Sequence, residues 1–179
     1  MTVLFFKDIA SFRMNRFKAI RSTLDNFSNV LEVVDIINAC SPEQMTGDEN
    51  NFDIALFTGD QSRILVKKND GYFSMAIPFQ IVNNGEGISF VCHQIEEEVS
   101  GYFTSLMKNA INTSEGKLVS QENIIFSLTD SFGLDFSEAI KYSEAFSTLI
   151  SDDHGYFRFD DDPDPSRMNE DIFQGYLLN

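Results

Sequence analysis

The chain has 179 residues, 42% of them hydrophobic, and a formal net charge of −15. This length and apolar content are typical of one folded domain, here residues 1–179, and argue against an intrinsically disordered chain. Because like charges repel, a surface this acidic argues against binding to nucleic acid or to an anionic membrane and favours basic partners.

The charge is unevenly distributed along the chain. The first 24 residues contain five of the thirteen basic residues and one acidic residue, whereas residues 25–179 contain eight basic and 27 acidic residues. Neither residues 22–62 nor residues 69–107 include a lysine or an arginine. Uncompensated charge of this kind either keeps a protein soluble or serves a basic partner.

The N-terminal part has helical periodicity. Apolar residues at three- and four-residue steps predict a helix over residues 8–27, with basic residues on its flanks. Ser28 is placed to cap a second helix that runs through Ile37 and stops before Pro42, since proline cannot continue a helix. Polar residues at 41–51 predict a solvated loop.

The pattern then changes to short apolar runs, which predict strands between Phe52 and Cys92. Residues 69–71, Asn-Asp-Gly, tolerate the positive φ angles of a tight hairpin turn, and a similar segment follows at residues 83–87. Pro78 is expected to bend a strand or to lie at an edge, because proline donates no ladder hydrogen bond. We predict an antiparallel meander of four to five strands.

The remainder is predicted to be helical. Acidic residues at the start of the segment 96–112 suit the first turn of a helix. A second helix is predicted over residues 120–133, and Asp135 with Glu138 forms a capping box that starts a third. Residues 155–159 then predict a late strand at a sheet edge. The expected fold class is α+β, with the antiparallel β-meander packed against N-terminal and C-terminal helices.

Residues suited to catalysis are few. The chain has two histidines, His93 and His154, and two cysteines, Cys40 and Cys92. Since adjacent residues of a strand point to opposite faces, Cys92 and His93 are poorly placed to act on one substrate atom. The sequence shows neither the ligand spacing of a zinc site nor the motif of a phosphate-binding loop. We therefore expect no enzymatic activity, no cofactor and two reduced cysteines.

Carboxylates concentrate in the loop Asp160–Asp171. If Asp160 is the first position of a calcium-binding loop, Asp162 and Asp164 take the third and fifth positions, but Pro165 occupies the sixth, where an EF-hand requires glycine. A solvated loop is therefore the preferred interpretation. A metal-dependent regulator or enzyme that uses this acidic loop stays open as an alternative.

In size, acidity and lack of catalytic residues, the chain is similar in general character to bacterial immunity proteins, including those of contact-dependent growth inhibition systems. The resemblance implies an inhibitor that binds and neutralises a basic cognate toxin, often a nuclease, in the cytoplasm. A cytoplasmic location is also expected because a signal peptide and an apolar membrane segment are not recognised. The alternative within the same class is a phage-type inhibitor that mimics nucleic acid.

The resemblance covers no motif, so candidate partner-binding residues come from the charge map alone. Carboxylates in loops can reach a partner without disturbing a helix or strand. Four residues meet this criterion best: Asp48, Glu49, Asp161 and Asp162.

Overall fold

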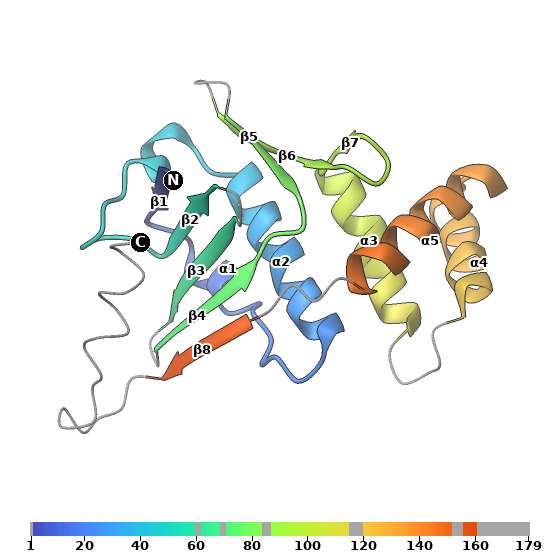
Figure 1. Cartoon of the computed structure of the whole chain (residues 1–179), viewed down its shortest axis with the longest axis horizontal. Helices are drawn as coiled ribbons and strands as arrows, with labels where there is room; N and C mark the ends of the chain where they lie inside the picture. Colours follow the sequence, from blue (N-terminus) through green and yellow to red (C-terminus); the bar gives the residue numbers. More distant parts are fainter. Residues whose placement is uncertain are drawn as a thin grey trace.

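A computed structural model describes residues 2–59, 62–68, 71–83, 87–114 and 120–151, together with the backbone of residues 156–160. Five α-helices and two antiparallel sheets make up this part of the chain (Figure 1). The fold is therefore α+β, as the sequence predicts.

The first sheet contains five antiparallel strands in the order β1-β2-β3-β4-β8. Their bounds are Thr2–Phe6 for β1, Ile54–Thr58 for β2, Arg63–Lys68 for β3, Gly71–Ala76 for β4 and Tyr156–Asp160 for β8. Lys68 pairs with Gly71, so β3 and β4 form the predicted hairpin. The predicted late strand is also confirmed, because β8 pairs with β4 at the edge of the sheet.

The second sheet contains three antiparallel strands in the order β5-β6-β7. They comprise Gln80–Asn83 for β5, Ile88–Cys92 for β6 and Glu97–Glu98 for β7. Pro78 lies between β4 and β5, where the chain leaves the first sheet. The predicted interruption at this proline therefore divides the strands into two sheets.

The helix predicted over residues 8–27 is wrong. This range instead contains a short helix α1 at Ser11–Met14 and the first residues of a long helix α2 at Thr23–Asn38. The N–H of Ile9 donates to Asp53 Oδ2 at 2.9 Å, so this backbone group bonds to a distant segment and not to a helical carbonyl. Ile9 is buried while Phe12 is 60% exposed, so the apolar spacing does not mark one buried helix face.

Helix α2 begins earlier than the sequence predicts. Ser22 is its N-cap, and its hydroxyl accepts a hydrogen bond from the N–H of Asp25 at 3.2 Å. Ser28 therefore lies inside the helix and does not cap it. The helix ends ahead of Pro42, as predicted, and the 3₁₀ helix η1 follows at Pro42–Met45.

The three C-terminal helices agree with prediction except at one start. They are α3 at Gly101–Ser114, α4 at Gln121–Phe132 and α5 at Phe136–Ser151. The predicted start at residues 96–98 is wrong, because Glu97 and Glu98 pair with β6 as strand β7. Gly133 ends α4 with φ 65°, and the carboxylate of Asp135 accepts a hydrogen bond from the N–H of Glu138 at the start of α5.

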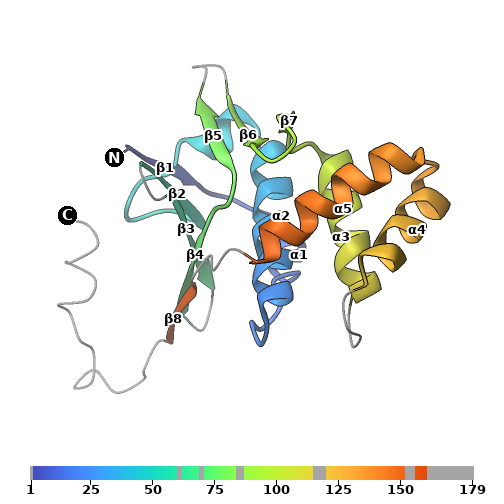
Figure 2. The ribbon, with the colours of Figure 1, turned by 45° about the vertical axis from the view of Figure 1, so that its right-hand side comes forward.

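Helix α2 lies between the first sheet and helices α3–α5, as Figures 1 and 2 show. It is apolar around most of its circumference, and its buried apolar residues are Phe27, Val30, Leu31, Val33, Val34, Ile36 and Ile37. The ring of Phe27 lies 6.4 Å from that of Phe79 and 6.2 Å from that of Phe146. One core therefore joins the sheets to the C-terminal helices.

Candidate functional site

Two of the four predicted partner-binding residues, Asp48 and Glu49, lie together in the loop between η1 and β2, and both are exposed. The carboxylate of Asp48 accepts the backbone N–H groups two and three residues further along the chain, at 2.9 and 3.0 Å. Asp48 therefore closes a local turn. Asp161 and Asp162 lie outside the described residues, so the structure does not test whether all four converge.

Cys92 and His93 differ sharply in their surroundings. Cys92 is fully buried, its Sγ donates to Gln94 Oε1 at 3.2 Å, and burial raises the pKa of its thiol. The thiolate, which is the reactive form, is disfavoured there. His93 is exposed and lines a groove of about 400 Å³ between the two sheets. The structure therefore does not place this pair on one face, and His154 lies outside the described residues.

A network of charged side chains joins α2 to α3. Lys108 Nζ lies 2.9 Å from Glu32 Oε2 and 2.6 Å from Asp35 Oδ2. Thr104 Oγ1 donates to the second oxygen of Asp35 at 2.6 Å, and Arg16 Nη1 donates to the second oxygen of Glu32 at 3.2 Å. Each carboxylate therefore has two donors, which favours a structural role.

The protonation of Lys108 supports that role. Burial disfavours its charged form, but hydrogen bonds and charges from Asp35 and Glu32 outweigh the effect and raise the pKa of the amine. The amine therefore stays protonated at neutral pH. A protonated amine is not a nucleophile, and this one is held between two carboxylates.

A smaller network joins β7 to α5. Lys141 pairs with one oxygen of Glu97, and the hydroxyl of Tyr142 donates to the other at 2.6 Å. Burial tends to raise the pKa of Glu97, but these two hydrogen bonds outweigh it and hold the pKa below its ordinary value. Burial and the adjacent carboxylate raise the pKa of Tyr142, so its hydroxyl remains a donor.

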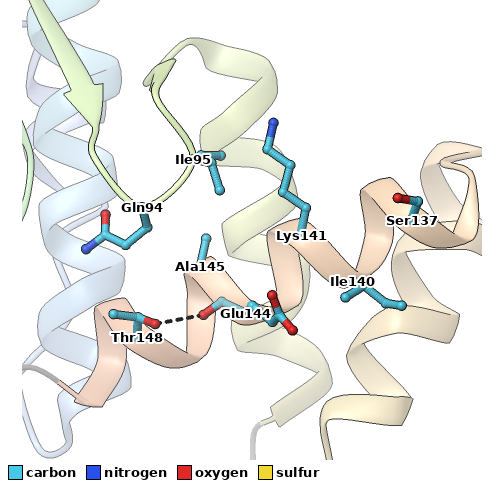
Figure 3. Close-up of a pocket in the computed structure, with 8 residues that line it drawn as sticks. All are labelled: Gln94, Ile95, Ser137, Ile140, Lys141, Glu144, Ala145 and Thr148. Atoms are coloured by element: carbon cyan, nitrogen blue, oxygen red, sulfur yellow. Dashed lines mark hydrogen bonds between the residues drawn. The ribbon is translucent and has the colours of Figure 1, made fainter.

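A groove of about 480 Å³ lies beside this network. Its lining comes from the turn after β6 and from one side of α5, and comprises Gln94, Ile95, Ser137, Ile140, Lys141, Glu144, Ala145 and Thr148 (Figure 3). Figure 3 shows the side chains of Lys141 and Glu144 directed apart. The groove therefore does not present a converging acid and base.

The solvent-facing side of α4 combines an exposed ring with exposed carboxylates. Phe126 is 65% exposed. Glu122 and Asp130, both exposed, lie four residues before and after it. Residues four apart are neighbours on a helix, so the three side chains form one stripe, which we call the α4 outer face. The helix contains no lysine, arginine or histidine.

Further exposed aromatic side chains lie on the neighbouring helices. Tyr102 of α3 is half exposed and packs edge-on against Phe132 of α4, with ring centroids 6.1 Å apart. Phe136, at the start of α5, is exposed next to Asp135. The charge map did not select these aromatic residues. For Phe126 the available sequence signal is its spacing, because it lies off the buried stripe of α4.

An exposed ring near the N-terminus has the opposite charge environment. Phe12, in α1, has the guanidinium carbons of Arg13 and Arg16 at 6.0 and 5.7 Å from its ring centroid. Both distances lie within the range of a cation–π interaction. The protein thus carries one exposed phenylalanine among cations and another among carboxylates.

Comparison with known proteins gives no match to a family model, a curated protein or a solved structure. In the described ranges, histidine, cysteine, aspartate and glutamate side chains do not gather in a group of three that could hold a metal ion. The acidic loop Asp160–Asp171, for which a metal-dependent role was the alternative, falls outside those ranges apart from the backbone of Asp160. The helices in the described part of the chain are too short or too polar to cross a membrane.

Proposed function

We propose that this protein is an acidic inhibitor of the bacterial immunity type, which binds and neutralises a basic cognate toxin, specifically a nuclease, in the cytoplasm. The observation that carries the proposal is the exposed acidic and aromatic surface of helices α3–α5. Carboxylates raise the rate at which a basic protein encounters that surface. Exposed phenylalanine and tyrosine side chains supply the kind of apolar area that protein interfaces bury.

The chemistry of the described residues supports binding over turnover. Cys92 is buried with a raised pKa, and Lys108 is fixed as a cation between two carboxylates. A general base or nucleophile needs a substrate-accessible position and a poised pKa. Neither group meets both requirements, so we propose that inhibition depends on occupying the partner's surface.

The proposal predicts that a gene adjacent to this one encodes a basic protein, and that protein is the partner used in the test. Co-expression should restore growth that the neighbouring protein alone arrests, and an equimolar mixture should suppress its nuclease activity in vitro. The neighbour is the wrong partner if the two proteins do not associate. If growth is arrested despite association, the inhibitor function is wrong.

A further inference from the structure

We infer that the α4 outer face, formed by Glu122, Phe126 and Asp130, is the docking surface for arginine side chains of a basic protein. The inference rests on the proposed function and names the surface and the chemistry of its partner. It differs from the loop that the charge map selects, which holds Asp48 and Glu49.

The spacing along α4 suits an arginine-bearing segment. Glu122 and Asp130 are eight residues apart, which corresponds to about 12 Å along a helix axis, with Phe126 midway between them. A guanidinium group can lie on the face of a phenylalanine ring while its N–H groups bond a carboxylate. A partner segment that follows α4 can therefore place one arginine on the ring and direct others to the two carboxylates.

The N-terminal region of this protein already displays part of that chemistry. The exposed ring of Phe12 has the guanidinium groups of Arg13 and Arg16 beside it. Phe126 has comparable exposure but lies on a helix that contains only acidic charges. Within α4 itself, Phe126 therefore has carboxylates and no cation as charged neighbours, which suits a cation supplied by another molecule.

Basic side chains elsewhere on the C-terminal helices are already paired. Lys108 of α3 is bound by Glu32 and Asp35, and Lys141 of α5 is bound by Glu97. They are thus committed to internal carboxylates. Glu122 and Asp130 keep their charge toward solvent, which gives this face its complementarity to a basic partner.

Arginine fits this surface better than lysine. The guanidinium is planar, stacks on aromatic rings and presents paired N–H groups to a carboxylate, whereas an ammonium is a strongly hydrated point charge. The α4 outer face should therefore discriminate between two peptides of equal charge. A general acidic surface would bind them nearly equally.

The test uses two alanine-based helical peptides of equal length, one with four arginines and one with four lysines, titrated into the full chain at low salt. We expect the arginine peptide to bind about threefold more tightly than the lysine peptide. Phe126→Ala and Phe126→Leu should both remove this preference, because leucine keeps apolar area without the ring. Since Phe126 is exposed, neither change should prevent folding.

Charge variants locate the surface. Glu122→Gln with Asp130→Asn should weaken both peptides about fivefold, as expected for two exposed ion pairs. The matched control, Asp48→Asn with Glu49→Gln, removes the same number of negative charges from the loop between η1 and β2. It should change the affinity for both peptides by less than about twofold. An equal loss in both variants would mean that only the overall field matters, which overturns the α4 assignment and leaves the proposed function standing.

Two further outcomes would overturn the assignment. The wild-type chain could bind neither peptide, in which case co-expression still decides the proposed function separately. Light scattering could also reveal self-association at low salt that disappears in the α4 variants. That result would assign the face to the basic N-terminal segment of a second copy.

Discussion

The carboxylates of α2 and those of α4 differ in what faces them. Glu32 and Asp35 of α2 each accept two donors from other elements, and Glu32 is largely buried. Glu122 and Asp130 of α4 are exposed on a helix without a basic residue. The same residue types therefore hold the layers together in one helix and remain available to a partner in the other.

The comparison separates stability from binding. Charges that are paired between α2 and α3 should affect folding when they are removed, because their partners would stay behind partly buried. Exposed charges on α4 should affect encounter with a partner and leave folding nearly unchanged. Variants of the two regions can break this division or sharpen it.

The largest expected difference lies between a buried and an exposed phenylalanine. Phe27→Ala should reduce the free energy of unfolding by about 3–5 kcal/mol, because the ring is 1% exposed and packs against Phe79 and Phe146. Phe126→Ala should change it by less than about 0.5 kcal/mol. Urea denaturation of both variants measures the contrast. A comparable loss for Phe126→Ala would mean that its ring is part of the core.

The next largest effect concerns the network between α2 and α3. Lys108→Met keeps the length of the side chain but removes the donor shared by Glu32 and Asp35. It should cost about 1–3 kcal/mol of unfolding free energy, which is the typical effect of losing hydrogen bonds to charged groups. Glu122→Gln is the control and should cost less than about 0.5 kcal/mol. If Lys108→Met and Glu122→Gln have equal free energies of unfolding, the network is not structural.

A smaller, pH-dependent effect is expected at Glu97, whose side chain is 36% exposed. The pKa of Glu97 is lowered from its ordinary value of 4.5 in the folded protein. The charge of Glu97 therefore stabilises the fold at pH values above 4.5, and this contribution is lost as the pH falls through the folded pKa. Glu97→Gln should cost less than about 1 kcal/mol at neutral pH. Urea denaturation at a series of pH values from 7 down to 3 should show that the difference in free energy of unfolding between Glu97→Gln and wild type shrinks. A constant difference would contradict the lowered pKa.

The fold was predictable where a local signal decided the structure. Gly133 ends α4 with a positive φ, and Lys68 pairs with Gly71 across the predicted turn. Prediction failed where distant partners decided. The N–H of Ile9, inside the predicted helix, bonds to Asp53, 44 positions further along the chain, and the acidic residues 97–98 pair with β6. Such pairings are tertiary and override local helix signals.

The candidate site was less predictable. The charge pattern identified acidic stretches, but it could not tell the paired carboxylates of α2 from the solvent-facing ones of α4. That distinction depends on Lys108, which lies 76 residues from Glu32 in sequence and 2.9 Å away in space. The exposure of Phe126 likewise depends on which sides of α4 pack against α3 and α5.

The most direct test of the central claim is the rate of association, as a function of salt, with the basic protein that an adjacent gene is predicted to encode. For the wild-type chain, raising the ionic strength from about 0.02 M to 0.15 M should slow association about tenfold or more, because salt screens steering by unpaired carboxylates. Glu122→Gln with Asp130→Asn should reduce this dependence, while Asp48→Asn with Glu49→Gln should retain most of it. Association that is insensitive to salt, or equally sensitive in both variants, would contradict the assignment of steering to α4.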